Sequence, residues 1–313
     1  MKVALFLEGS PGHEKQSLAI IQGFKRLVSV EVTEFRLPER TKWQRFFDIG
    51  RLFLGSNRGK VQGLDDFDLA IGTGSRTHAP LIACKNSYGI PIVTCMAPDR
   101  LLRGKFDLCC VPRHDQLEEK DNILLTDGPP VLSAEKNIRR EPDKGLILLG
   151  GIDESSHFWR GVELAEFIRN IVHEGKDIQW SISSSPRTPD DTVEILKGYS
   201  ESQPNATFFD FKDTPRGWVE DQYAKSGVAW VTADSVSMIY EALTAGCRVG
   251  ILPVPWKNAR NKFQRSIDFL LLKGLVKVYS PAESTSLLSM AEQDFNEADR
   301  CAEEILRKIQ PTG

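Results

Sequence analysis

The chain has 313 residues, of which 41% are hydrophobic and 27% charged, and its formal net charge at pH 7 is −3. The composition is typical of a soluble globular protein, and the length allows two domains that each bury a core. Without a basic excess, no nucleic-acid partner is expected. No apolar run approaches the roughly 18 residues of a membrane-spanning helix. The N-terminal segment also lacks the apolar stretch of a signal peptide. We therefore expect a cytoplasmic protein, with peripheral contact to the inner face of a membrane left open.

The first half alternates short apolar runs, bounded by Gly or Pro, with helical patterns, as buried parallel strands and their crossover helices do. Strands are expected at 3–7, 30–35, 69–72, 92–95 and 108–111, with helices at 14–27 and 78–88. The composition becomes charged and loses its apolar period over 133–144, which predicts a domain boundary. We place the first domain at 1–137 and the second at 138–282, with a C-terminal helix at 283–313 packing back on the first.

The second half repeats the alternation. Strands are expected at 146–149, 178–183, 207–211, 228–231 and 248–252, with helices at 157–173, 190–199, 218–225, 236–245 and 266–272 and a largely helical stretch at 282–309. Two successive series of this kind predict an α/β protein with two doubly wound Rossmann-like domains facing a central cleft at the carboxyl ends of both sheets.

The loops expected after the strands carry glycine, hydroxyl side chains and arginine. Glycine lets backbone approach a phosphate, and Ser, Thr and Arg supply donors. In the first domain these residues are Gly9, Gly12, His13, Gly74, Arg76, Arg113, His114 and Asp115. In the second they are Gly151, Ser184, Ser185, Arg187 and Thr188. Ordinary turn chemistry explains each loop taken singly. Arg187 suits a diphosphate, and it would otherwise pair with Asp190 or Asp191.

The stretch 228–255 reads as a strand, a polar turn, a helix ending before Gly246 and a second strand. Asp234, Ser235 and Ser237 lie at the helix N-terminus, where free N–H groups and the helix dipole favour an anion. Glu241 follows one to two turns later, where its carboxylate can accept hydrogen bonds from sugar hydroxyls. These residues predict a nucleotide-diphosphate site without a metal, although Ser, Asp and Glu also serve simply as caps and helix formers.

Metal and disulfide chemistry are not expected. The six cysteines (Cys84, Cys95, Cys109, Cys110, Cys247 and Cys301) contain no C-x-x-C pair and predict buried free thiols. Asp66-Phe67-Asp68 matches a D-x-D metal motif, but it precedes a strand, so we interpret it as a pair of solvated strand-entry carboxylates. We predict no metal and no cofactor besides the substrate.

The segment Arg40–Lys60 interleaves six basic residues with seven large apolar ones. This pattern indicates either a helix on an anionic membrane surface or beside a lipid-linked acceptor, or a core helix with a solvated basic face.

Five motifs together resemble the "elongated mitochondria" fission-protein family. They are PRHDQ at 112–116, LLTDGPP at 124–130, LLGG at 148–151, SSSPRTP at 183–189 and VTADSVSMIYEA at 231–242. Bacterial members of that family are expected to have the GT-B fold of metal-independent glycosyltransferases that use nucleotide sugars. Plant members are implicated in recruiting a dynamin-related protein to mitochondria. The chain departs from the family pattern at Gly12-His13 and at Ser184-Ser185-Pro186.

The resemblance implies an inverting glycosyltransferase that acts on a cell-envelope, saccharide or lipid-linked acceptor. The alternative is an inert GT-B-like scaffold that recruits a membrane-remodelling partner. By the same analogy, Met238 joins the donor helix, and Asn261, Lys262 and Gln264 reach the donor sugar or diphosphate. A base for the acceptor hydroxyl is expected from His13, Asp115 or His114.

Overall fold

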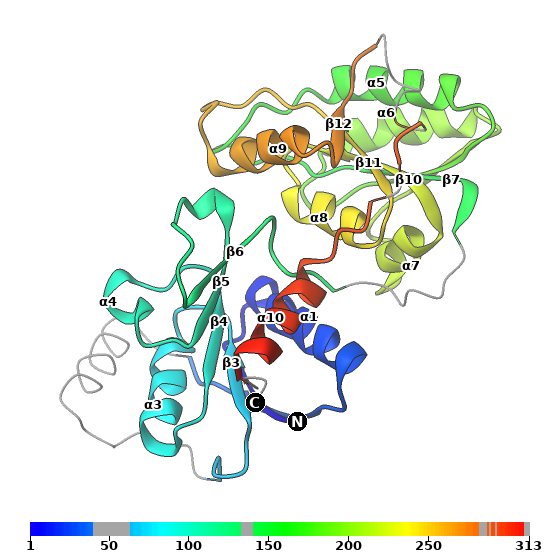
Figure 1. Cartoon of the computed structure of the whole chain (residues 1–313). Coiled ribbons are helices and arrows are strands. Elements are labelled where there is room, and N and C mark those ends of the chain that lie inside the picture. Colours follow the sequence, from blue (N-terminus) through cyan, green and yellow to red (C-terminus); the bar gives the residue numbers. More distant parts are fainter. Residues whose placement is uncertain (40–62, 133–139, 282–286, 288, 292, 310–313) are drawn as a thin grey trace. The chain divides into compact units, whose positions relative to one another are not determined.

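The computed structural model describes residues 1–39, 63–132, 140–281, 287, 289–291 and 293–309 (Figure 1). The chain divides into two compact units: unit 1 is Met1–Leu132 with Asn296–Gly313, and unit 2 is Ser133–Phe295. Each unit contains a six-stranded sheet in which every strand pair is parallel. The prediction of two doubly wound α/β units is confirmed.

Unit 1 has the strand order β2-β1-β3-β4-β5-β6. Its strands are β1 (Lys2–Leu7), β2 (Glu31–Arg36), β3 (Leu69–Gly72), β4 (Ile92–Cys95), β5 (Leu108–Pro112) and β6 (Ile123–Thr126). Its helices are α1 (Pro11–Leu27), α3 (His78–Tyr88), the short α4 (Arg100–Arg103), a 3-10 turn at Arg113–Asp115, and α10 (Glu297–Ile309). After β1 the chain adds β2 on one side of it, and it then crosses to add β3 on the other side. The carboxyl ends of β1 and β3 therefore form the topological switch point of this sheet.

Unit 2 has the strand order β12-β11-β10-β7-β8-β9. Its strands are β7 (Glu141–Leu148), β8 (Gln179–Ser183), β9 (Ala206–Phe209), β10 (Ser226–Thr232), β11 (Arg248–Leu252) and β12 (Val276–Val278). Its helices are α5 (Gly161–Glu174), α6 (Asp190–Glu201), α7 (Trp218–Lys225), α8 (Val236–Thr244) and α9 (Lys262–Leu272). The switch point here lies between β7 and β10, because the strands that follow β7 build outward on opposite sides of this pair.

The C-terminal helix is shorter than the sequence predicts. The described residues between 287 and 296 are not α-helical, and α10 begins at Glu297 after Asn296, whose side-chain oxygen accepts the Asp299 N–H at 3.0 Å. Leu287 is buried in the core of unit 2, so this stretch leads from one core to the other rather than forming a single amphipathic helix. Helix α10 packs on α1, with the Ala298 carbonyl oxygen 2.7 Å from where a Cβ on Gly23 would lie.

Three further predictions have clear outcomes. All six cysteines are buried and free, as predicted. Asp66 and Asp68 both bind Lys2 at the amino end of β3, and the Asp66 side chain is 83% exposed, which agrees with solvated strand-entry carboxylates. Within the described ranges, no helix combines the length and apolar character needed to cross a bilayer. The basic, aromatic segment Arg40–Lys60 lies outside the described residues.

Candidate functional site

The switch point of unit 2 joins the loops that follow β7 and β10. The Gly150 N–H donates to Thr232 Oγ1 at 2.7 Å, and the Gly151 N–H donates to Asp234 Oδ2 at 3.0 Å. Both acceptors belong to the end of β10 or to the turn that leads into α8. The two loops therefore form one hydrogen-bonded unit at the carboxyl end of the sheet, the usual position of a ligand site in a doubly wound fold.

Arg187, from the loop after β8, is bonded into this unit. Its Nη2 donates to Asp234 Oδ2 at 2.9 Å and its Nη1 to the Gly151 carbonyl at 3.4 Å. The Arg187 side chain is 44% exposed, whereas that of Asp234 is 1% exposed. Asp234 Oδ1 is also buried and has no hydrogen-bond partner among the described residues. Asp234, rather than Asp190 or Asp191, is the carboxylate that pairs with Arg187, and it leaves part of the guanidinium facing solvent.

The glycines after β7 make room for atoms of the protein itself. A Cβ on Gly150 would overlap the Asp234 carboxylate, and a Cβ on Gly151 would overlap the backbone of Arg187 and Thr188. Sequence analysis linked this loop to the close approach of a phosphate. In the structure, the absence of a Cβ at Gly150 and Gly151 allows the loops after β7, β8 and β10 to pack this closely.

The hydroxyl groups after β8 bond within the protein. Ser185 Oγ and Thr188 Oγ1 donate to the Gly150 carbonyl at 2.5 and 2.6 Å. Ser184 Oγ donates to Asp210 Oδ1 at 3.3 Å and accepts the Phe211 N–H at 2.9 Å. All three side chains are buried. Their role in this structure is to tie the loops after β7, β8 and β9 together.

The N-terminus of α8 is the polar surface beside Arg187. Ser235 occupies the N-cap position, yet its side chain makes no capping hydrogen bond. No partner for the Ser235 or Ser237 hydroxyl occurs among the described residues, and Ser237 is exposed. The first N–H groups of a helix lack intrahelical acceptors, and the helix dipole is positive there. This end of α8 can therefore accept an anion.

Glu241 and Met238 lie further along α8. The Tyr223 hydroxyl donates to the Met238 carbonyl at 3.2 Å and lies 3.5 Å from Glu241 Oε2. Burial, and then the neighbouring Glu241 carboxylate, raise the pKa of Tyr223 well above its usual value. Tyr223 is therefore neutral, and its single hydroxyl proton lies within reach of both the Met238 carbonyl and the Glu241 carboxylate.

The three residues predicted around the start of α9 bond locally. Asn261 caps the helix by accepting the Gln264 N–H at 2.9 Å, which explains why α9 begins at Lys262 rather than Ser266. Lys262 Nζ lies 5.2 Å from the centre of the Phe263 ring, and Gln264 Nε2 donates to Asp268 at 2.6 Å. These contacts stay within the loop and α9. They do not join the group formed by Arg187, Asp234 and Gly151, which is called the Arg187 cluster below.

Sequence analysis missed His157 and placed it inside a helix. The structure places this residue before α5, 3% exposed, with Nε2 3.0 Å from the Gly151 carbonyl and Nδ1 2.7 Å from Ser156 Oγ. A carbonyl can only accept, so Nε2 carries the proton. His157 therefore donates a hydrogen bond that holds the loop containing Gly151 in place. The contact spans six residues, and no helical or strand period reveals it.

Unit 1 has a second polar cluster at its own switch point. The Glu8 carboxylate, directly after β1, is 2.6 Å from His13 Nδ1 and accepts the Arg76 N–H at 2.9 Å. His13, Gly74 and Arg76 are among the site residues predicted from the sequence, whereas Glu8, at the start of the same predicted loop as His13, is not. The available signal was a carboxylate directly after the apolar run 3–7. Gly9 lies beside this cluster and donates its N–H to Glu14 at 2.6 Å, while Gly12 faces open space.

The other candidate bases lie after β5. His114 Nε2 is 3.6 Å from Asp115 Oδ1, and both side chains are partly exposed. Arg113 pairs with Asp127 at 2.8 Å rather than with Asp115, which lies two residues further along the same loop. The reason is that β6, which the sequence prediction omitted as a strand, brings Asp127 beside the end of β5.

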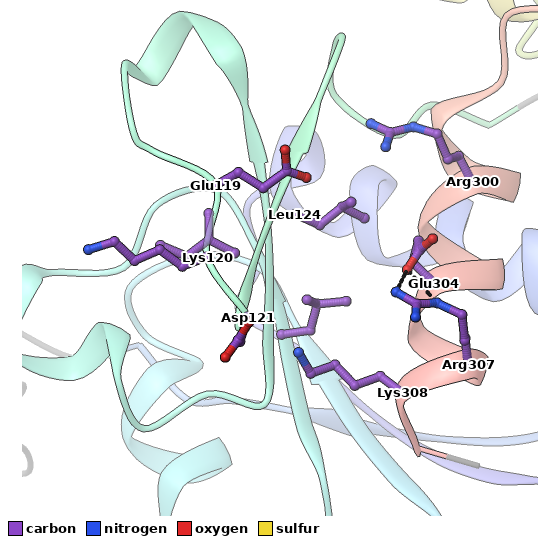
Figure 2. Close-up of a pocket in the computed structure, with 10 residues that line it drawn as sticks. Glu119, Lys120, Asp121, Leu124, Arg300, Glu304, Arg307 and Lys308 are labelled. Carbon is purple, nitrogen blue, oxygen red and sulfur yellow. Dashed lines mark hydrogen bonds and ion pairs between the residues drawn. The ribbon is translucent and has the colours of Figure 1, made fainter. Parts of the chain in front are cut away.

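A cavity of about 640 Å³ lies in unit 1, lined by α10 and by residues around the starts of β5 and β6 (Figure 2). It lies at the amino ends of the strands, opposite the switch point. Two of its lining arginines have carboxylate partners: Arg307 binds Glu304, which also lines the cavity, and Arg300 binds Glu297. Nothing in its lining resembles a reactive constellation. Within the described ranges, no three His, Cys, Asp or Glu side chains form a group suited to a metal ion.

Solved structures with the same fold include nucleotide-sugar enzymes. The UDP-GlcNAc 2-epimerase from Methanocaldococcus jannaschii has a TM-score of 0.55 and 14% identity, covering 98% of this chain and 99% of its own. MurG from Acinetobacter baumannii has a TM-score of 0.54 and 16% identity, with 99% coverage of both chains. The glycosyltransferase SnogD from Streptomyces nogalater has a TM-score of 0.51 and 12% identity, covering 99% of this chain and 95% of its own. The shared fold is GT-B.

No curated protein matches the sequence. A family comparison matches residues 11–309, which is nearly the whole chain. The chain belongs to the Mitochondrial fission ELM1 family.

Proposed function

We propose that this protein is a metal-independent glycosyltransferase that takes its sugar from a nucleotide diphosphate. The observation that carries the proposal is the half-exposed Arg187 guanidinium, held by the buried Asp234 carboxylate, at the switch point from which α8 starts. A planar guanidinium can bind phosphate oxygens in a bidentate manner. With the free N–H groups of α8, it can neutralise the charge of a departing diphosphate, the task that a metal performs in other enzymes.

The remaining groups on α8 suit the other parts of a donor. Ser237 offers an exposed hydroxyl to the phosphates, and Glu241 can accept hydrogen bonds from ribose hydroxyls. Ser235 is buried, but its hydroxyl makes no capping hydrogen bond, and we propose that it also binds a phosphate. The buried Ser184, Ser185 and Thr188 act in this proposal as the frame of the site rather than as direct ligands. The similarity to enzymes whose names include UDP-GlcNAc, such as the epimerase described above, supports a nucleotide sugar as the partner.

The acceptor is proposed to be a cell-envelope, saccharide or lipid-linked molecule, with the protein in the cytoplasm and Arg40–Lys60 in contact with an anionic membrane face. Inverting stereochemistry is part of the same proposal by analogy. The family name favours one alternative, a GT-B-like scaffold that recruits a membrane-remodelling protein without catalysis. The two proposals differ in whether the donor site binds nucleotide.

Nucleotide binding tests the proposal directly. UDP, GDP and CDP are titrated into the protein by calorimetry, without metal and then with magnesium, and compared with the nucleosides. Arg187→Ala should weaken diphosphate binding about ten- to a hundredfold, the equivalent of about 1.5–3 kcal/mol for a charge-assisted hydrogen bond, and affect nucleosides little. Arg169→Ala, an exposed arginine on α5, is the matched control and should bind as the parent does. Failure of every diphosphate to bind would overturn the transferase proposal and favour the scaffold.

A further inference from the structure

Glu8 is a carboxylate buried at the switch point of unit 1, with 5% of its side chain exposed. A buried charge is costly unless it is paired and hydrogen-bonded. Both oxygens have partners: Oε1 is 2.6 Å from His13 Nδ1, and Oε2 accepts the Arg76 N–H at 2.9 Å with Arg76 Nε at 3.8 Å. Glu8 therefore joins the loops that follow β1 and β3.

The loop after β3 is shaped around this carboxylate. Gly74 has φ of +101°, a region that side chains other than glycine rarely adopt, and an added Cβ would overlap the Glu8 carboxylate. Thr77 Oγ1 donates to the Gly74 carbonyl at 2.7 Å and holds the turn. Thr73 and Ser17 share a buried hydroxyl contact of 2.7 Å that fixes the loop to α1, the helix of His13. The position of the Glu8 carboxylate is thus determined by several independent contacts.

The contact with Glu8 sets the tautomer of His13. An ionised carboxylate can only accept hydrogen bonds, so the proton between the two groups belongs to His13 Nδ1. In the neutral ring, Nε2 then carries the lone pair. No partner of Nε2 occurs among the described residues, and the His13 side chain is 34% exposed. An imidazole held on one nitrogen by a buried carboxylate and open on the other is the arrangement of an oriented general base.

We propose that His13 Nε2 is the general base of the transfer reaction and that Glu8 is its positioning residue. This inference rests on the proposed function. In the step, an acceptor hydroxyl oxygen forms a bond to the anomeric carbon, and the bond from that carbon to the diphosphate oxygen breaks. The diphosphate leaves with the bonding electrons, and the hydroxyl proton moves to Nε2. Glu8 stabilises the resulting imidazolium through the Nδ1–H bond and remains ionised.

The tautomer of His13 can be measured without any substrate. The full-length protein, labelled with ¹⁵N-histidine, is studied by long-range ¹H–¹⁵N correlation NMR, and His13 is assigned from the loss of its signals in His13→Gln. The expected spectrum has a protonated Nδ1 and an Nε2 with a free lone pair. A wild-type spectrum with the proton on Nε2 would overturn the proposal, whether or not any variant folds.

Glu8→Gln should reverse the tautomer. The Arg76 N–H needs an acceptor, so the amide oxygen should take the position of Oε2 and the NH₂ group should face His13 Nδ1. Nδ1 would then accept, and the proton would move to Nε2, leaving no lone pair for catalysis. Glu14→Gln is the control. It also removes one negative charge, at the residue that follows His13 in sequence, and it should leave the tautomer unchanged. An unaltered tautomer in folded Glu8→Gln would contradict the positioning role.

Kinetics separate this proposal from the proposed function. With a donor and acceptor in hand, Glu8→Gln and His13→Gln should each lower kcat at least about a hundredfold. Both variants should bind the nucleotide diphosphate as tightly as the parent, because they leave the Arg187 cluster intact. If the parent protein itself binds no nucleotide diphosphate, the proposed donor site is refuted. Parent-like kcat in either variant would refute the His13–Glu8 base alone.

Discussion

Gly151→Ala tests whether the close packing of the loops at the unit 2 switch point holds the site together. The added Cβ would overlap the carbonyl of Arg187 and the backbone nitrogen of Thr188. These are backbone atoms, which cannot move aside as the end of a long side chain can. The loop after β7 or the loop after β8 must therefore shift, and Arg187 must shift with it.

The cost follows from the contacts that such a shift breaks. The Ile152 N–H donates to the Arg187 carbonyl at 2.9 Å, and the Gly151 N–H donates to the buried Asp234 at 3.0 Å. Overpacking in a tight interior typically costs about 1–3 kcal/mol. Each weakened hydrogen bond adds about 1 kcal/mol. We expect a loss of about 3 kcal/mol, since neither bond can be kept at full strength while the overlap is relieved.

Thermal unfolding followed by calorimetry measures this loss. For a unit of this size, about 3 kcal/mol lowers the Tm by at least about 6 °C. The matched control is Gly198→Ala, on the exposed face of α6, where an added Cβ meets nothing within 4 Å. That change should raise stability by up to about 1 kcal/mol, because alanine favours a helix over glycine. If Gly151→Ala unfolds at the temperature of the parent and binds nucleotide equally well, the packing argument is wrong.

Two further predictions concern other parts of the chain. In the native protein at pH 8, the six cysteines should not react with a thiol reagent, and all six should react after denaturation. Burial raises the pKa of Cys84, Cys109 and Cys247 to about 12, so these thiols stay protonated until the pH approaches that value, and rapid labelling at pH 8 would contradict the burial. If Arg40–Lys60 binds a membrane surface, the protein should sediment with anionic but not neutral liposomes. Replacing both Arg45 and Arg51 with Glu should abolish the sedimentation, because each basic residue near such a surface contributes about 1 kcal/mol. Equal sedimentation with both liposome types would refute the electrostatic contact.

Much of the fold could be predicted because buried parallel strands leave a strong local signal. The strands β3, β4 and β11 are short apolar runs with a turn residue on one side, and their predicted bounds agree with the structure. The prediction failed where the local signal was weak. Strand β6 lies inside a stretch identified only as a family motif, and β12 has three residues, too few for a period. Before α10 the composition is helical, but the described residues between 287 and 296 are not α-helical, and Leu287 packs in the core of unit 2.

The site could be predicted only as a set of residue types at the ends of strands. The sequence indicates that Arg187, Asp234 and Gly151 belong to neighbouring loops. It does not indicate that they bond to one another, because the contacts join positions 36 to 83 residues apart. For the same reason, the sequence predicts the hydroxyls of Ser185 and Thr188 as ligands, whereas in the structure they donate to the Gly150 carbonyl. Which polar groups remain free for a ligand depends on this internal hydrogen bonding.

The two units have a similar arrangement of charged groups at their switch points. Each buries one carboxylate there, Glu8 in unit 1 and Asp234 in unit 2, and each gives it a backbone N–H and an arginine as partners. In each, the absence of a Cβ on a glycine leaves room for the carboxylate. The difference lies in the group that the carboxylate orients toward solvent, an imidazole in unit 1 and a guanidinium in unit 2. A neutral imidazole can take a proton and a guanidinium cannot, whereas a guanidinium keeps its charge for a phosphate at any physiological pH. This difference is the physical reason for assigning the base to unit 1 and the diphosphate to unit 2.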